Sequence, residues 1–254
     1  MKKENANLKL KVTLVVPTLN EINGIRVIMP RVKRELIHQI IIVDGGSTDG
    51  TIEYAREMGY EVYLQKERGI RLGLIENYPN IKGDIIITFS PDGNSVPEEI
   101  PPLIEKMEKG YDMVIVSRYL GEARSFDDTF ISRLGNWLFT KIINFLFGFH
   151  YTDALVMFRA YKTSVPVKLG ITKRRSALYE RLIGRYISWE PQLSVRCAKR
   201  RLKITEIPGD EPLRVEDEGG VIRSNRLLPP SRIYHFRSGF ACLYMFIEEF
   251  IRNH

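Results

Sequence analysis

Short apolar runs alternate with amphipathic segments along the first half of the chain. The runs are rich in valine and isoleucine and predict strands at residues 12–16, 40–43, 61–64, 84–89 and 112–116. The segments between them predict helices at about 24–36, 48–58 and 97–109. Apolar strands separated by helices are typical of a mostly parallel sheet that is covered on both faces. The expected fold class is therefore α/β, with ligands bound beyond the carboxyl ends of the strands.

The second half of the chain has a less regular pattern. Its periodicity predicts helices at about 131–149, 176–186 and 190–200, and a strand near 203–207. Glycine, proline and charged residues over 209–230 favour a long loop.

The chain closes with an amphipathic helical appendage. We expect one domain over residues 1–230 and this helix over 231–254. Its large apolar side chains are Phe236, Phe240, Leu243, Tyr244, Phe246, Ile247, Phe250 and Ile251. Three positions remain open for it, namely packing on the domain, on a partner copy in a homodimer, or on a membrane surface.

Composition narrows the class of protein. The 254 residues are 44% hydrophobic and 27% charged, as in a globular domain. Two cysteines, Cys197 and Cys242, are too few for a disulfide framework, so a reduced, cytoplasmic compartment is expected. No stretch approaches the roughly 18 apolar residues that span a bilayer, so membrane contact would be peripheral, on the inner face.

The net charge of +7 favours anionic partners such as nucleotide phosphates or acidic lipids. No basic segment is interleaved with aromatic residues as in a nucleic-acid platform, so no nucleic-acid partner is expected.

Polar side chains gather directly after the predicted strands. The segments at these tips are 17–21, 44–51, 90–94 and 117–119. Three of them carry carboxylates and the fourth carries an arginine. Since the carboxyl ends of parallel strands share one edge of a sheet, these side chains are expected to converge.

The glycine-rich loops that commonly cradle phosphates are absent from this sequence. It contains no GxxxxGK[ST] motif, and no GxGxxG follows the first strand. A bound diphosphate would therefore need a divalent cation and arginines for neutralisation. Asp92 and Asn94 offer oxygen ligands, and Arg118, Arg133 and Arg214 offer the guanidinium groups.

These motifs together resemble family 2 glycosyltransferases of the GT-A fold, and most of all the polyprenyl-phosphate mannose or glucose synthases. The resemblance covers roughly residues 10–215. The matching segments are 15–21, 42–51, 90–92, 117–119, 132–136, Asp153 with 158–160, and 205–208 followed by Arg214.

The resemblance implies a donor site that holds a nucleotide-diphospho-sugar. The residues that would line its nucleoside pocket are Pro17, Leu19, Glu21, Asp44 and Gly45. An alternative role for Asp44 is to brace the turn through Ser47 and Thr48. Asp92 and Asn94 match the latter part of the family's Asp-x-Asp-x-Gln motif, which implies Mg²⁺ or Mn²⁺ as cofactor.

The resemblance also implies groups at the acceptor and at the leaving group. Arg118, Ser132 and Arg133 match the region that meets the acceptor phosphate. Arg214 matches a basic residue that closes over the donor diphosphate. Negative charge develops there as the glycosidic bond breaks, so a cation and an arginine stabilise the transition state preferentially.

The sequence departs from the family pattern at several of these places. Ser90 stands where the first metal-motif aspartate usually lies, so metal affinity should rest largely on the nucleotide. Asp128 replaces a frequent arginine, and residues 156–157 replace a usual Ser-Gly pair. The last loop carries Arg223 and Arg226 instead of Ser-Lys.

These departures leave the acceptor open between a polyprenyl phosphate, which is slightly favoured, and a soluble or glycan hydroxyl. A phosphate is already ionised at neutral pH, whereas a hydroxyl needs a base, for which Asp153 is the candidate. An alternative role for Asp153 is to cap a loop or helix.

The leading hypothesis is an inverting glycosyltransferase that takes its sugar from a GDP- or UDP-sugar. A catalytically weakened nucleotide-sugar-binding protein is the alternative that Ser90 suggests. A nucleotidyltransferase is disfavoured, because no basic glycine-rich loop follows the first strand.

Overall fold

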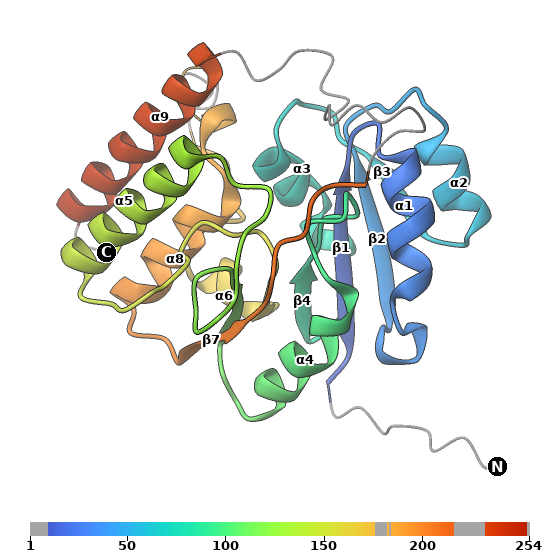
Figure 1. The fold of residues 1–254 in the computed structure, drawn as a ribbon, viewed down its shortest axis with the longest axis horizontal. Helices are drawn as coiled ribbons and strands as arrows, with labels where there is room; N and C mark the ends of the chain where they lie inside the picture. The colour runs from blue at the N-terminus through green and yellow to red at the C-terminus, as the bar shows by residue number, and fades with distance from the viewer. Residues whose placement is uncertain (1–9, 176–181, 183, 216–231, 253–254) are drawn as a thin grey trace.

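The computed structural model describes residues 10–175, 182, 184–215 and 232–252. Within them, strands form a sheet in the order β3-β2-β1-β4-β6-β5-β7 (Figure 1). The strands are β1 Val12–Thr18, β2 Gln39–Asp44, β3 Glu61–Leu64, β4 Ile85–Thr88, β5 Met113–Ser117, β6 Arg159–Lys162 and β7 Ile204–Pro208. Only β6 runs antiparallel to its neighbours, β4 and β5, in this sheet of the described residues. The mostly parallel sheet expected from the sequence is confirmed.

Helices cover both faces of the sheet. They are α1 Ile22–Ile28, α2 Thr51–Glu57, α3 Ile70–Asn77, α4 Ile100–Glu108, α5 Phe130–Phe147, α6 Ser164–Lys168, α8 Trp189–Lys199 and α9 Arg232–Ile251. Alternate side chains of β1 enter two separate cores, because successive residues of a strand point to opposite faces. Leu14 belongs to the core that contains buried residues of α1, α2 and α4, whereas Val15 belongs to the core that contains buried residues of α3, α5, α8 and α9.

The closing helix α9 lies beside α5, on the face of the sheet toward which Val15 points (Figure 1). The rings of Phe246 and Phe139 pack edge to face with centroids 5.8 Å apart, and Phe250 meets Phe147 at 6.4 Å. Among the described residues no helix is long and apolar enough to cross a membrane.

The structure corrects the predicted helix at 24–36. Helix α1 ends at Ile28, and Pro30 lies in a 3-10 turn, Met29–Arg31. Proline has no N–H to donate to the carbonyl four residues earlier, which ends the α-helix here.

Three short elements were not predicted, namely α3, α6 and β6. The strand β6 begins with the charged Arg159 and has no apolar run, and pairing with β4 and β5 makes it a strand. Most of the predicted helix at 176–186 lies outside the described residues. Its last three residues, Gly184–Tyr186, form a 3-10 turn. Residues 216–230 of the predicted loop, with Arg223 and Arg226, also lie outside the described residues.

Candidate active site

The loops that follow β1 and β2 are joined by hydrogen bonds. The Asn20 side-chain oxygen accepts from the Thr48 N–H at 2.9 Å, and the Ser47 hydroxyl accepts from the Asn20 N–H at 2.8 Å. The Glu21 N–H donates to the Thr51 hydroxyl at 3.0 Å. Asn20 has φ of 56°, a left-handed conformation that asparagine tolerates better than most residues. The two loops therefore form one unit at the edge of the sheet.

Asp44 is fully buried at the end of β2. Its Oδ1 accepts from the N–H groups of Gly46 and Ser47 at 2.8 and 2.7 Å. Its Oδ2 accepts from the hydroxyls of Thr18 and Ser47, both at 2.7 Å. Both oxygens are used within the protein, so Asp44 braces the turn on which the neighbouring residues are presented.

The other predicted nucleoside-pocket residues surround this turn. Pro17 pairs in register with Val43, at the carboxyl end of β1. Leu19 is 56% exposed, and a Cβ on Gly45 would lie 3.4 Å from its Cδ1 atom. Glu21 follows on the same loop, so these predicted residues lie together at the edge of the sheet.

The predicted metal ligands lie on the turn after β4. The Asp92 Oδ1 accepts from the Asn94 N–H at 3.1 Å. The Asn94 Oδ1 is buried and has no hydrogen-bond partner. Helix α1 packs tightly on this turn at Gly24, where a Cβ would lie 2.5 Å from the Pro91 carbonyl oxygen.

Arg214 reaches the same turn from the segment after β7. Its Nε donates to the Asp127 Oδ2 at 3.1 Å, and its Nη1 lies 3.6 Å from the Asp92 Oδ2. The Asn94 amide also donates to the Asp127 Oδ2, at 3.0 Å. Burial disfavours the charge of Arg214, but Asp92 and Asp127 outweigh burial and raise the pKa of the guanidinium. Arg214 therefore remains a cation beside the metal-motif carboxylate.

Arg118, at the end of β5, is bound by carboxylates. Its Nε and Nη2 donate to the two oxygens of Asp153 at 2.6 and 3.1 Å. Its Nη1 donates to the Glu211 Oε2 at 3.1 Å and lies 3.9 Å from the Asp128 Oδ2. Burial disfavours the charge, but Asp153 and Glu211 raise the pKa of Arg118 above its ordinary value.

Asp153 is fully buried, and both of its oxygens accept hydrogen bonds from Arg118, so it holds the guanidinium in place. Its Oδ1 also accepts from the Asn136 amide at 3.2 Å. The Glu206 carboxylate accepts from the N–H groups of Thr152 and Asp153 at 2.9 and 3.1 Å, which fixes the backbone beneath.

The predicted acceptor residues lie in the first turn of α5. The Thr129 hydroxyl accepts from the Ser132 N–H at 3.2 Å, and the Ser132 hydroxyl donates to the Thr129 carbonyl at 2.9 Å. The Arg133 Nη2 donates to the Ser125 carbonyl at 3.3 Å, and the Ser125 hydroxyl donates to Glu211. Ser125 and Glu211 thus connect the start of α5 to Arg118.

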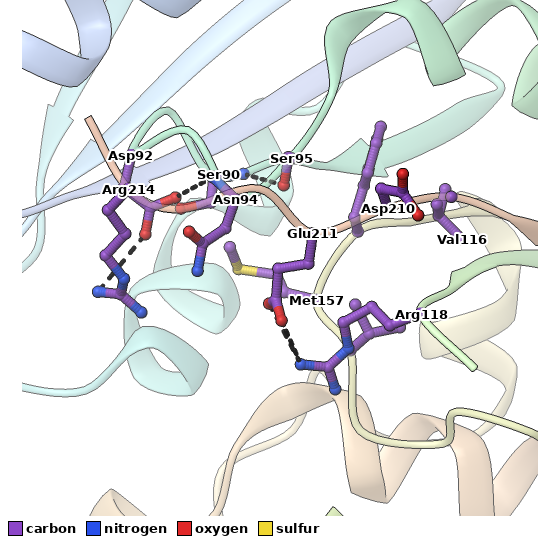
Figure 2. Close-up of a pocket in the computed structure, with 13 residues that line it drawn as sticks. Ser90, Asp92, Asn94, Ser95, Val116, Arg118, Met157, Asp210, Glu211 and Arg214 are labelled. Carbon is purple, nitrogen blue, oxygen red and sulfur yellow. Dashed lines mark hydrogen bonds and ion pairs between the residues drawn. The ribbon is translucent and has the colours of Figure 1, made fainter. Parts of the chain in front are cut away.

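A cavity of about 170 Å³ lies among these loops, and Figure 2 shows Asp92 with Arg214 on one side and Glu211 with Arg118 on the other. Four predicted site residues line it, namely Asp92, Asn94, Arg118 and Arg214. The predicted residues that do not line it are Pro17, Leu19, Glu21, Asp44, Gly45, Ser132, Arg133 and Asp153. The structure therefore brings the predicted metal ligands together with Arg214, which was predicted for the diphosphate, and with Arg118, which was predicted for the acceptor phosphate.

Residues 13–169 match the profile of Glycosyl transferase family 2. The chain belongs to this family. The chain is 28% identical to the glycosyltransferase AglJ of Haloferax volcanii over 198 residues, 78% of this chain and 61% of AglJ. It is 27% identical to an undecaprenyl-phosphate 4-deoxy-4-formamido-L-arabinose transferase of Aeromonas hydrophila, over 77% of this chain and 62% of that one. The chain thus spans about three fifths of these relatives.

The fold of this family 2 chain is similar to that of glucosyl-3-phosphoglycerate synthase from Mycobacterium tuberculosis, solved with Mn²⁺, uridine diphosphate and phosphoglyceric acid. The TM-score is 0.66 at 17% identity, over 97% of this chain and 80% of that one. The GT-A architecture that the motifs implied is confirmed.

The residues around Asp92 fit a divalent cation of the kind this family implies. The Asp92 carboxylate and the unpartnered Asn94 Oδ1 are hard oxygen ligands on one turn. Among the residues that the structure describes, no three His, Cys, Asp or Glu side chains form a metal-binding group. Mg²⁺ is commonly held by one or two carboxylates together with substrate phosphates, so the remaining ligands of such a cation would come from a diphosphate.

Sequence reasoning missed Asp127 and Glu211 in this family 2 site. Asp127 is the first residue of an Asp-Asp pair just before α5, and only the second was considered. Glu211 lies three residues before Arg214, on a segment with no regular pattern. The signal for each was its nearness in sequence to a predicted site residue.

Proposed function

We propose that this chain transfers a sugar from a nucleotide-diphospho-sugar to a polyprenyl phosphate, with inversion at the anomeric carbon. The observation that carries this proposal is the single cavity in which Asp92, Asn94 and Arg214 lie opposite Arg118. One side supplies oxygen ligands and Arg214 for a diphosphate. On the other side, Arg118 would bind a second anion by exchanging its ion pair with Glu211 for that anion.

On the donor side, the nucleoside would lie on Leu19 and Gly45, above the turn that Asp44 braces. Mg²⁺ or Mn²⁺, held by Asp92 and Asn94, would neutralise the diphosphate and stabilise it as a leaving group. Arg214 would keep its Nε hydrogen bond to Asp127 and turn its Nη groups toward diphosphate oxygens. GDP- and UDP-sugars are the donors we propose.

On the acceptor side, a phosphate would meet Arg118, Arg133 and Ser132 near the first turn of α5. A phosphate oxygen is already anionic, so it attacks the anomeric carbon without a general base. This agrees with Asp153, which is fully buried with both oxygens bound to Arg118, and which we assign to positioning. The name of the Aeromonas relative adds support for an undecaprenyl phosphate in particular.

Transfer to a hydroxyl acceptor is the second candidate, and Glu211 is the observation in its favour. Glu211 lines the cavity, and burial raises the pKa of its carboxyl, an effect that Arg118 partly offsets. A carboxylate with a raised pKa in a cavity is suited to accept a proton from a hydroxyl.

Ligand binding is the first test. Thermal unfolding would be followed with UDP, GDP and CDP, each with and without Mn²⁺ or Mg²⁺. We expect one nucleotide to raise the Tm only with metal, because a ligand that binds the folded state stabilises it by about 2.7 kcal/mol at a hundredfold excess over its Kd. The variant Asp92→Asn should remain folded and lose the metal-dependent part of the rise in Tm. Equal shifts with and without metal would contradict the cation site.

Transfer assays then separate the acceptors. The matching sugar donor would be offered a short polyprenyl phosphate or a series of sugars carrying free hydroxyls. Product on the phosphate alone supports the proposal, and product on a sugar alone supports the second candidate. Nucleotide binding without product in either series would identify a sugar-nucleotide-binding protein instead. A polyprenyl phosphate resides in a bilayer, so we propose that the chain works at the cytoplasmic face of a membrane.

A further inference from the structure

The outward side of α5 carries large apolar side chains from its first turn to its last, with the exposed Lys141 among them. Its exposed large side chains are Phe130, Ile131, Leu134, Trp137, Leu138 and Phe145, between 46% and 87% exposed. A helix on the surface of a water-soluble domain ordinarily presents polar residues on this side. Apolar patches of this extent mark an interaction surface.

The outward side of α9 continues this surface. Its exposed side chains are Phe240, Leu243, Tyr244, Ile247, Phe250 and Ile251. The two helices lie next to each other (Figure 1), joined through Phe139 and Phe246. We call the exposed apolar side chains of both helices the α5–α9 face.

The two carboxylates of α9, Glu248 and Glu249, point the opposite way, into the protein. The Glu249 side chain is 1% exposed and lies 2.6 Å from Arg196, 3.3 Å from Arg175 and 3.7 Å from Lys199. A helix that faces water would bury its apolar residues and expose its carboxylates. Helix α9 buries its carboxylates together with Met245 and Phe246 and presents a second set of large apolar side chains outward, which suits an apolar environment.

The charges bordering this face are positive. Helix α5 contains Arg133 and Lys141 and no acidic residue, and both side chains are exposed. On α9, Glu248 is paired with Arg252 at 3.0 Å, while Arg237 is exposed. Cations around an apolar face are complementary to anionic lipid headgroups around acyl chains.

We propose that the α5–α9 face docks the protein on an anionic lipid bilayer, with both helices lying in the interface. The face begins at Phe130, one turn from Arg133, and Arg133 is connected to the cavity through Ser125 and Glu211. Docking would therefore place the cavity at the headgroup level. That consequence rests on the proposed function, whereas docking itself does not.

The test is flotation with vesicles in a density gradient. The face variant is Phe145→Glu with Phe240→Glu, since these side chains are 87% and 78% exposed and contribute little to the core. The control variant is Val27→Glu with Leu64→Glu, at 52% and 54% exposure, outside both helices. Both variants change the net charge equally, and circular dichroism would establish that both fold.

We expect the wild type and the control to float with vesicles of phosphatidylcholine and phosphatidylglycerol, and to float less with phosphatidylcholine alone. The partition coefficient of the face variant should be lower by about tenfold or more, because two aromatic side chains that would enter the bilayer are replaced by charges. Flotation of the face variant like the wild type would overturn the proposal. A wild type that does not float, and that sediments as a dimer while the face variant sediments as a monomer, would also overturn the proposal.

The proposed function is tested separately in the same proteins. Transfer to a water-soluble short polyprenyl phosphate, without vesicles, should be equal in the wild type and the face variant. Loss of flotation with intact transfer identifies a docking surface. Flotation without transfer would leave docking standing and contradict the proposed function.

Discussion

The Asp127 carboxylate holds Arg214 through one oxygen, with the Arg214 Nε donating to Oδ2 at 3.1 Å. The same oxygen accepts from the Asn94 amide at 3.0 Å. One residue thus connects the arginine proposed for the diphosphate to an amide proposed for the cation. Asp127 orients both groups before the donor arrives, which lowers the entropy that donor binding must overcome.

The first prediction concerns Asp127→Asn. Loss of a charge-assisted hydrogen bond costs about 1.5 to 3 kcal/mol, so we expect the Kd of the metal–nucleotide complex to rise roughly tenfold or more. The measurement is titration calorimetry with nucleotide at saturating Mn²⁺. Glu122→Gln, which removes an exposed charge, serves as control. An unchanged Kd in Asp127→Asn would show that Asp127 does not orient these groups.

The second prediction concerns the ion pair of Arg118 with Asp153. Arg118→Ala leaves Asp153 buried without its partner, which typically costs about 3 to 5 kcal/mol. Urea unfolding measures this loss. The control Arg31→Ala breaks an exposed pair with Glu98 and should cost no more than about 1 kcal/mol. Equal losses in the two variants would contradict the structural role of Arg118.

The third prediction concerns the pH dependence set by Glu211. Burial raises the pKa of this carboxyl above its ordinary value of 4.5, against the partial opposition of Arg118. The folded state therefore binds this proton more tightly than the unfolded state. The resulting stability is present below the unfolded-state pKa and is lost as pH rises through the folded-state pKa.

Glu211→Gln removes this titration, so its free energy of unfolding should fall less than that of the wild type as the pH rises from about 4.5 to 7. Denaturant unfolding at several pH values checks the difference between the two proteins. A difference that stays constant with pH would be inconsistent with a raised pKa.

The fourth prediction compares two helical glycines. Gly24→Ala would place a Cβ 2.5 Å from the Pro91 carbonyl oxygen, so the turn after β4 that carries Asp92 and Asn94 must move. We expect a destabilisation of about 1 to 3 kcal/mol and weaker Mn²⁺-dependent nucleotide binding. Gly135→Ala in α5 meets no atom within 4 Å and should stabilise by about 0.5 to 1 kcal/mol. A similar change in the free energy of unfolding in both variants would argue against close packing at Gly24.

Local patterns were sufficient for most of the fold. The apolar runs of β1, β2, β4 and β5 are buried on both faces, so their side chains alone indicate strands. The strand β6 gives no such signal, because pairing between distant segments makes it a strand. Its Ala160, for example, pairs with Ile87, 73 positions earlier in the chain.

The candidate site was predictable where the motif and the strand tip coincide, as for Asp92 and Arg118. Asp127 and Glu211 act through contacts with residues 33 and 93 positions away. No spacing rule describes such pairs, since they depend on how loops fold over the sheet. For the same reason, the sequence left the role of Asp153 open between a base and a structural carboxylate.

The position of β6 between β4 and β5 has a consequence for the width of the cavity. Parallel neighbours would bring the carboxyl ends of β4 and β5 to one strand spacing, about 4.8 Å, whereas an intervening strand doubles this separation to roughly 10 Å. At this edge β6 contributes its amino end, preceded by Val156, Met157 and Phe158, which form the floor of the gap. The intervening strand thus sets Asp92 and Arg118 apart, which leaves room for the two anionic groups of the proposed reaction.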